Sequence, residues 1–220
     1  MKQTKSTLVY REIKNNLMKG QYLPGEKLKI SDLKAEYNFS LAPLREALSQ
    51  LAAQGLLNQE INKGYSIPHL SLDDILNIKN GRVLIESEAL KLSLKNGDID
   101  WEAKLISAHH KLEKYSLAPE TLEEWSYAHE AFHSILLSGS TNHYLINFST
   151  QLNLALNKYR SINGSDVLIR KTLDKQHYEL LQCALNRDID KATKILVEHI
   201  ELSCQSAINS LQEASESVSI

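Results

Sequence analysis

The scarcity of helix-breaking residues most limits what this chain can fold into. Only eight glycines and four prolines occur among 220 residues. From residue 71 onward, apolar side chains recur at the spacing of one helix face, and the short sequences NGD, APE, SGS, NGS and NRD divide one periodic segment from the next. The sequence therefore predicts a mostly α-helical protein whose C-terminal part is an antiparallel all-helical bundle.

The bundle is expected to contain six helices. The first begins at Ser71-Leu-Asp-Asp74, which resembles a capping box with Asp in the place of Glu, and runs to about residue 94. The segments 99–115, 120–137, 141–161, 166–186 and 189–213 are the other five. Residues 214–220 are mostly small and polar, so we expect a flexible tail there.

The first 70 residues follow a different pattern. Helices are predicted over 7–19, 30–37 and about 43–53, with a turn at Pro24-Gly25 after the first helix. The segments 56–60 and 65–68 flank Asn62-Lys63-Gly64, which predicts a β-hairpin with Gly64 at positive φ. Three helices followed by a hairpin are typical of a winged helix-turn-helix. We therefore expect a DNA-binding domain over 1–70 and a helical domain over 71–213.

Composition and charge agree with this division. Apolar residues make up 42% of the chain, no apolar run is long enough to span a membrane, and the N-terminus has no apolar core of a signal peptide. Two cysteines do not make a disulfide framework, so a cytoplasmic location is expected. Residues 1–70 hold ten Lys and Arg against six Asp and Glu, a net charge of +4, whereas residues 71–220 hold fifteen against twenty-one, a net charge of −6. A basic first part suits contact with nucleic acid.

The second helix of a helix-turn-helix enters the major groove, and its N-terminal residues contact bases and phosphates. With Leu44, Leu48 and Leu51 in the core, the residues expected toward DNA are Ser40, Leu41, Ala42 and Arg45. Arg45 can donate two hydrogen bonds to a guanine or a phosphate. Lys27, and Lys63 with Gly64 in the wing, could reach neighbouring phosphates. The alternative that Arg45 pairs with Glu36 or Glu46 at the surface stays open.

Three segments of residues 8–68 resemble the DNA-binding domain of GntR-type transcription regulators. They are GQYLPGEKL, SLAPLREALSQLAAQGLL and INKGYSI. The resemblance implies DNA-contact roles for Lys27, Ser40, Arg45 and Gly64. The chain departs from the family pattern at Tyr22, and more at Leu41 and Ala42, where the family usually has Arg and Thr. This departure implies fewer phosphate contacts there and a different operator.

Four histidines of the C-terminal part could hold a metal ion. His129 and His133 lie four residues apart, hence one turn apart on one helix face. His177 and His199 lie within two later helices, and helical bundles build metal sites from inward side chains of facing helices. The alternative, four hydrogen-bonded core histidines, is not excluded by spacing.

A helical domain behind a GntR-type domain resembles the FadR-type branch of that family. Its metal-binding members carry Asp or Asn, then Phe-His, then two further His about 22 residues apart. Phe132-His133, His177 and His199 fit that pattern, with His129 in the usual Asp or Asn place. The resemblance implies a divalent metal ion. Imidazole ligands favour zinc, with nickel or manganese as alternatives.

The histidine in place of a carboxylate has an electrostatic consequence. Four neutral imidazoles leave the full +2 charge of the ion, so an anionic effector is favoured as a further ligand. His129 could instead lie behind the ligands and leave a position open. Arg82 and Arg160 are the candidates to bind a second carboxylate, although Arg82 could equally pair with Glu86. Weaker effector candidates are Asn142 and Tyr159, and the histidines interpreted as surface or capping residues are His69, His109, His110 and His143.

These observations favour a ligand-responsive transcription regulator that binds a DNA operator as a homodimer. Release of DNA by effector is the commoner family behaviour, so a repressor is expected. WSYAHEAFH and its following segments resemble carbon-starvation-induced regulators of glutarate and γ-aminobutyrate catabolism, which implies a small carboxylate effector such as glutarate. A regulator that senses the metal itself is the alternative. A metal-assisted hydrolase is disfavoured because Glu130 points away from the face shared by His129 and His133.

Overall fold

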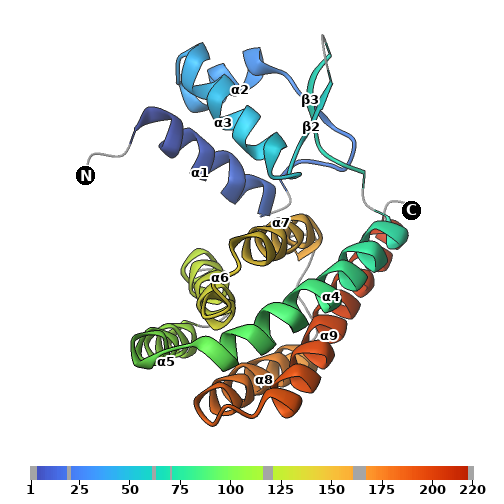
Figure 1. The fold of residues 1–220 in the computed structure, drawn as a ribbon. Helices are drawn as coiled ribbons and strands as arrows, with labels where there is room; N and C mark the ends of the chain where they lie inside the picture. The colour runs from blue at the N-terminus through green and yellow to red at the C-terminus, as the bar shows by residue number, and fades with distance from the viewer. Residues whose placement is uncertain are drawn as a thin grey trace. The chain divides into compact units, whose positions relative to one another are not determined.

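The computed structural model describes residues 4–18, 21–60, 63–69, 71–115, 121–160 and 167–217, which form nine helices and three short strands (Figure 1). The chain divides into two compact units: Met1–Asp74 with 153–164 and 208–220, and Ile75–Leu152 with Ser165–Ala207. We call the elements before residue 68 the winged part and the helices after it the helical part. The residue ranges of the two domains stay a prediction.

Apart from one additional strand, the winged part has the predicted order of elements. Its elements are α1 (Lys5–Met18), β1 (Lys27–Leu28), α2 (Ile30–Tyr37), α3 (Leu41–Ala53), β2 (Asn58–Glu60) and β3 (Gly64–Ser66). The strands form one antiparallel sheet in the order β1-β3-β2. Strand β1 was not predicted, because two residues are too few for an alternating pattern. It is held by pairing Lys27 with Ser66 and Leu28 with Tyr65.

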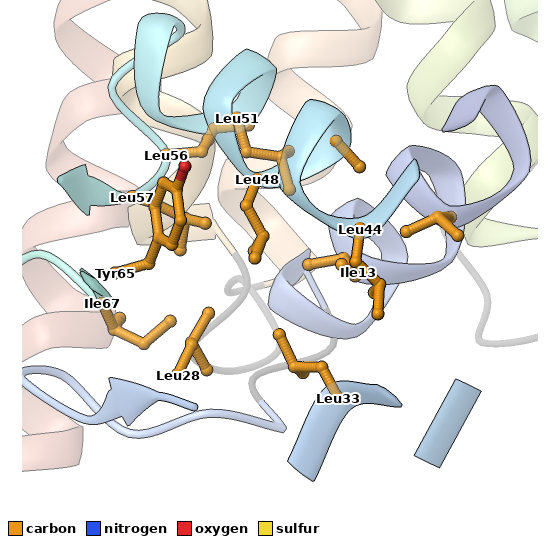
Figure 2. Close-up of a cluster of buried hydrophobic side chains, with 12 residues drawn as sticks. Ile13, Leu28, Leu33, Leu44, Leu48, Leu51, Leu56, Leu57, Tyr65 and Ile67 are labelled. Atoms are coloured by element: carbon orange, nitrogen blue, oxygen red, sulfur yellow. The ribbon is translucent and has the colours of Figure 1, made fainter. Parts of the chain in front are cut away.

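An apolar cluster of twelve buried side chains holds the winged part together (Figure 2). Leu44, Leu48 and Leu51 extend from one face of α3 into this cluster. They meet Ile13 of α1 and Leu33 of α2 there. Because the apolar face of α3 is buried in this core, its opposite face is available to solvent or to a partner.

The turn between α2 and α3 sets the start of the second helix. Asn38 ends α2 in the left-handed conformation, with φ 53°. Ser40 is extended and precedes α3, which begins at Leu41, two residues before the predicted start. Pro43 therefore lies inside the first turn, where its missing N–H leaves no helical hydrogen bond unmade.

The wing is the hairpin that the sequence predicts. Gln59 pairs with Tyr65 and Glu60 with Gly64, and the Lys63 N–H donates to the Glu60 carbonyl at 3.1 Å. Gly64 has φ +89°, so the predicted positive φ is confirmed. Asn62, the first residue of the predicted turn, lies outside the described residues.

The helical part contains all six predicted helices. They are α4 (Leu72–Asn96), α5 (Ile99–Lys114), α6 (Leu122–Ser138), α7 (His143–Arg160), α8 (Val167–Leu185) and α9 (Ile189–Ser217). The predicted end of the last helix, residue 213, is wrong, because α9 continues through Ser217. Neither Gly nor Pro interrupts residues 214–217, and Ala and Glu are good helix formers. The flexibility of the tail stays a prediction. No helix among the described residues has the length and apolar character needed to cross a lipid bilayer.

The start of α4 is tied to the end of α7. Ser71 Oγ accepts the Asp74 N–H at 3.1 Å, which is one half of the predicted capping box. In a capping box, the Asp74 carboxylate would accept the backbone N–H of Ser71. It accepts a hydrogen bond from the Tyr159 hydroxyl at 2.7 Å. Burial raises the pKa of Tyr159, so the hydroxyl keeps the proton that it donates.

Candidate metal centre and nucleic-acid interface

Three helices bring the four predicted histidines together. His129 and His133 lie one turn apart on α6, His177 on α8 and His199 on α9. Each is at most 6% exposed, and apolar neighbours from the same helices, such as Phe132 and Ile200, are fully buried. The periodicity that buries these apolar residues also turns the histidines inward, so the helices build the cluster as part of their core.

The cluster has the dimensions of a metal site. One ring nitrogen from each histidine lies within 4.8 Å of the corresponding atoms of the other three. The Nε2 atoms of His133 and His177 are 3.2 Å apart. Nitrogens bound tetrahedrally to zinc at about 2.0–2.1 Å are about 3.4 Å from one another, so the four donors fit one divalent ion. Four core histidines that merely satisfy one another would not need all their nitrogens to converge on one point.

Residues around the cluster orient its rings. His199 Nδ1 lies 3.2 Å from the buried Gln176 Oε1, and an N–H donated there leaves Nε2 of His199 for an ion. Trp125 stacks on His129 with ring centroids 4.8 Å apart. Phe132 lies edge-on to both His133 and His177. Sequence reasoning missed Gln176 and Trp125, since neither is distinguished from its neighbours by spacing.

Arg82 forms the ion pair that the sequence left as its alternative role. Its guanidinium donates to both carboxylate oxygens of Glu86, at 2.7 and 3.3 Å, and both side chains are fully buried in the helical part. Burial alone would lower the pKa of Arg82, but the Glu86 carboxylate raises it above the ordinary value. A third bond, 3.4 Å long, runs to Ser203 Oγ on α9, four residues after His199. Arg82 thus contacts α9 one turn from the histidine cluster.

The other predicted residues of the helical part fall in different places. The side chain of Arg160 lies outside the described residues. Asn142 caps α7, with its Oδ1 accepting the backbone N–H of Tyr144 and Leu145. His69, His110 and His143 are exposed, as predicted.

His109 corrects the sequence-based interpretation, which placed it at the surface. It is 4% exposed and packs against Phe132 and Tyr178. Burial lowers the pKa of His109, and an interaction of its Nδ1 with Glu113, 3.6 Å away, partly opposes that shift. The ring follows the buried stripe of α5 formed by Trp101, Leu105, Ala108 and Leu112, which the sequence could have shown.

The exposed face of α3 carries the residues predicted to face DNA. Ser40, Leu41, Ala42 and Arg45 are all exposed, and the Ser40 side chain makes no capping bond to α3. Within the described part of the chain, Arg45 has neither Glu36 nor Glu46 as an ion-pair partner. The arrangement leaves a guanidinium and a hydroxyl at the start of the second helix of a helix-turn-helix.

The wing and β1 add two exposed lysines. Lys27 lies on β1, and Lys63 at the tip of the wing pairs with Glu60 at 2.7 Å. The Glu60 carboxylate raises the pKa of Lys63, and Lys63 lowers the pKa of Glu60. Both groups are solvent-exposed, so a phosphate can compete with Glu60 for Lys63 at little cost.

Two family models match the chain. Residues 5–67 match the model described as bacterial regulatory proteins, gntR family, and residues 76–202 match the FCD domain. The first match covers the winged part. The second covers most of α4, all of α5 to α8 and the first half of α9, with all four clustered histidines.

Relatives of known name agree over nearly the whole chain. The HTH-type transcriptional repressor GlaR of Escherichia coli strain K12 is 33% identical, over 87% of this chain and 90% of its own. The uncharacterized HTH-type transcriptional regulator BphR of Paraburkholderia xenovorans strain LB400 is 32% identical, over 88% of this chain and 81% of its own.

Solved structures share the fold. The E. coli protein McbR/YncC superposes with a TM-score of 0.74 at 20% identity, covering 96% of this chain and 99% of that one. A GntR regulator from Rhodococcus sp. RHA1 gives 0.73 at 17% identity, covering 94% and 99%. The families and relatives are transcription regulators, so the hydrolase hypothesis is set aside. The chain therefore belongs to the gntR family of bacterial transcription regulators and carries the FCD effector-binding domain behind its winged helix-turn-helix.

Proposed function

We propose that this regulator is a repressor whose operator affinity is controlled by a small carboxylate bound at a metal centre in the helical part. The observation that carries the proposal is the convergence of four buried imidazoles from three helices within 4.8 Å. Because these side chains come from three packed helices, a ligand bound to them would also change how the helices pack. An effector can change DNA affinity only through a difference between two such arrangements.

His129, His133, His177 and His199 would hold the ion, which is zinc first on the chemistry of the donors, with nickel or manganese as alternatives. Neutral imidazoles leave a +2 charge in a buried site, and such a charge favours an anionic oxygen ligand. The bond to Gln176 would fix the tautomer of His199, and the stacked Trp125 would limit rotation of His129. The helical part thereby keeps its donors in place before the ion arrives.

A dicarboxylate such as glutarate is the effector we propose, with its second carboxylate on Arg82 or Arg160. Arg82 contacts Ser203, which lies one turn after His199 on α9. This contact supports the proposal that Arg82 can reach an effector bound at the histidine cluster. Because Glu86 already pairs with Arg82, the effector would have to share or replace a carboxylate there. This exchange favours an effector that is itself a carboxylate over a neutral ligand.

Calorimetry on metal-loaded protein tests the effector class with succinate, glutarate, adipate and valerate. Glutarate should bind at least about tenfold more tightly than valerate, because a monocarboxylate leaves the arginine without the effector's second charge. Arg160→Gln tests the second arginine and leaves the Arg82–Glu86 pair intact. Equal affinity for glutarate and valerate would remove the arginine contact.

Operator binding separates the proposal from the metal-sensor alternative. Glutarate should weaken operator binding of metal-loaded protein, while zinc added to stripped protein without a carboxylate should leave operator affinity nearly unchanged. A full response to zinc alone would make the ion the signal. His133→Ala, His177→Ala and His199→Ala should each lose the metal, whereas His110→Ala, at an exposed histidine, serves as the matched control.

DNA contact is proposed for Ser40, directly before α3, for Arg45 on α3, for Lys27, and for Lys63 with Gly64 in the wing. Arg45→Ala should weaken operator binding by about 1–3 kcal/mol if Arg45 binds a base. Fluorescence anisotropy at several salt concentrations distinguishes a base contact from a phosphate contact, because loss of a phosphate contact reduces the salt slope by about one. Unchanged affinity would remove the recognition-helix assignment.

A homodimer is the proposed assembly, since a palindromic operator requires a twofold partner. Exposed apolar side chains support it: Leu84 on α4 and Tyr144 and Phe148 on α7 are exposed, and Phe148 is 50% exposed. The two helices approach each other at Gly81 and Leu152, since a Cβ at Gly81 would lie 3.2 Å from the Leu152 side chain. Phe148→Lys should give monomers in sedimentation, with Leu168→Lys, at another exposed apolar residue, as control.

A further inference from the structure

Leu41 is an apolar side chain in an unusual place. It is the first residue of α3 and is 46% exposed, while Leu44, Leu48 and Leu51 of the same helix are fully buried. One exposed leucine on an ordinary surface needs no explanation. At the start of the second helix of a helix-turn-helix, however, side chains contact base edges, so an apolar group there has a defined environment once DNA is bound.

The neighbours of Leu41 sharpen that environment. Ala42 is also exposed, and neither side chain can donate or accept a hydrogen bond. Ser40 precedes them with a hydroxyl that does not cap α3, and Arg45 follows one turn after Leu41. The first turn of α3 therefore presents two apolar side chains between two polar ones.

The major groove offers one apolar feature to such a surface. Guanine, cytosine and adenine present hydrogen-bonding groups there, whereas thymine also presents its C5-methyl group. A phosphate would gain nothing from Leu41 or Ala42, because it needs hydrogen-bond donors. Base edges without a methyl group would lose water on contact and receive no bond in return.

We propose that Leu41, with Ala42 beside it, recognises thymine methyl groups in the operator and is a specificity-determining residue. The inference rests on the proposed role of α3 as the recognition helix. Leu41 and Arg45 are one turn apart, about 5.4 Å along the axis, and bases in one strand are about 3.4 Å apart. If Arg45 contacts a base, the thymine should lie one or two base pairs from that base.

Deoxyuridine tests this directly, since it pairs like thymidine and lacks only the methyl group. The probe is a duplex selected by the full-length protein from a random pool, with each thymidine then replaced singly by deoxyuridine. At one or two positions in each half-site, the replacement should weaken binding about fourfold, or about 0.8 kcal/mol at 1.4 kcal/mol per tenfold.

Two variants assign the effect to a residue. Leu41→Ala should bind the thymidine and deoxyuridine duplexes with equal affinity at those positions, and its exposed site makes loss of folding no concern. Leu23→Ala is the matched control, since Leu23 is 69% exposed in the winged part outside α3, and it should keep the fourfold discrimination.

The outcomes separate this inference from the proposed function. If Arg45→Ala weakens binding while no thymidine is sensitive to deoxyuridine, α3 contacts DNA and the role of Leu41 is wrong. Discrimination that persists in Leu41→Ala also overturns it, because another residue then contacts the methyl group. If neither Arg45→Ala nor Leu41→Ala changes operator affinity, the recognition-helix assignment itself fails.

Discussion

The two parts of this regulator use their cores in opposite ways. The winged part is centred on an apolar cluster, and the residues proposed for DNA contact lie on its surface. The helical part instead buries charged and titratable side chains: Arg82, Glu86, His109 and the four clustered histidines are all buried there. Of the described residues in the winged part, Lys14 is the buried charged side chain.

The two parts therefore obtain their stability from different sources. Burial of apolar surface stabilises the winged part whatever it binds, so its DNA-contact residues can vary without loss of the fold. Buried histidines and an ion pair stabilise little by themselves, because removal of polar groups from water opposes their mutual attraction. The stability of the helical part should therefore depend on what its core binds. Both tryptophans of the chain, Trp101 and Trp125, lie in this part, so tryptophan fluorescence follows its unfolding and not that of the winged part.

The largest expected effect follows from breaking the buried ion pair. Glu86→Gln leaves the guanidinium of Arg82 buried without a carboxylate, which should lower the free energy of unfolding by about 3–5 kcal/mol. Urea unfolding followed by tryptophan fluorescence measures this loss. Glu60→Gln, in the exposed pair with Lys63, should change stability by no measurable amount, and equal effects of the two variants would contradict the comparison.

Truncation of a core side chain in the winged part should lower the stability of that part and leave unfolding of the helical part unchanged. Leu48→Ala removes a fully buried side chain and should lower the stability of that part by about 2–5 kcal/mol. Circular dichroism should show an earlier unfolding step, while metal content and the tryptophan transition stay as in the wild type. If the tryptophan transition shifts equally, the two parts unfold together and the distinction between them is lost.

Metal removal should affect only the helical part. At a free metal concentration about a hundredfold above Kd, binding stabilises the folded state by about 2.7 kcal/mol, which a chelator removes. Differential scanning fluorimetry with intrinsic tryptophan should show this as a lower Tm in the wild type and in His110→Ala. His177→Ala should begin at the lower Tm and not respond to the chelator; a response there would place the ion elsewhere.

The smallest expected effect concerns acid. Burial lowers the pKa of His109 below its ordinary value of 6.5, so its neutral ring belongs to the folded state. The stabilisation that it contributes is complete above about pH 6.5 and is lost as the pH falls further, because the unfolded chain then binds the proton more readily. His109→Gln should therefore show a smaller fall in Tm between about pH 7.5 and about pH 5.5 than the wild type. His110→Gln should fall as much as the wild type does, and an equal fall in all three proteins would count against the assignment.

Periodicity predicted the elements well because long helices repeat one signal many times. Helix α2 has the predicted bounds, and the others differ by a few residues at their ends. Strand β1 escaped because two residues carry no period, and its pairing with β3 is a long-range contact. The end of α9 was misplaced because polar composition alone does not stop a helix that lacks Gly and Pro.

Spacing placed only His129 and His133 together, since residues on one helix face share a direction. His177 and His199 were added because bundles build sites from facing helices and because the chain resembles the FadR-type branch. Spacing could not decide whether Arg82 pairs with Glu86, because an i,i+4 pair on a helix forms only where the surroundings favour it over other partners. Gln176 acts through an inter-helix bond to His199, and no local pattern encodes such a bond. The burial of His109 could have been predicted from the apolar stripe of α5. It was missed because His109 was interpreted together with its exposed neighbour His110.

The short connector between β3 and α4 has a consequence for the search along DNA. Five residues, 67–71, join the two elements, and a chain of that length spans at most about 20 Å. In the proposed homodimer, each recognition helix would therefore be confined to a small volume around the start of its own α4. Once one half-site is occupied, the effective concentration of the second helix is high at spacings within that volume and falls towards zero beyond it. The length of the connector thus acts as a ruler for the operator, and residues inserted into it would relax the spacing at the expense of affinity.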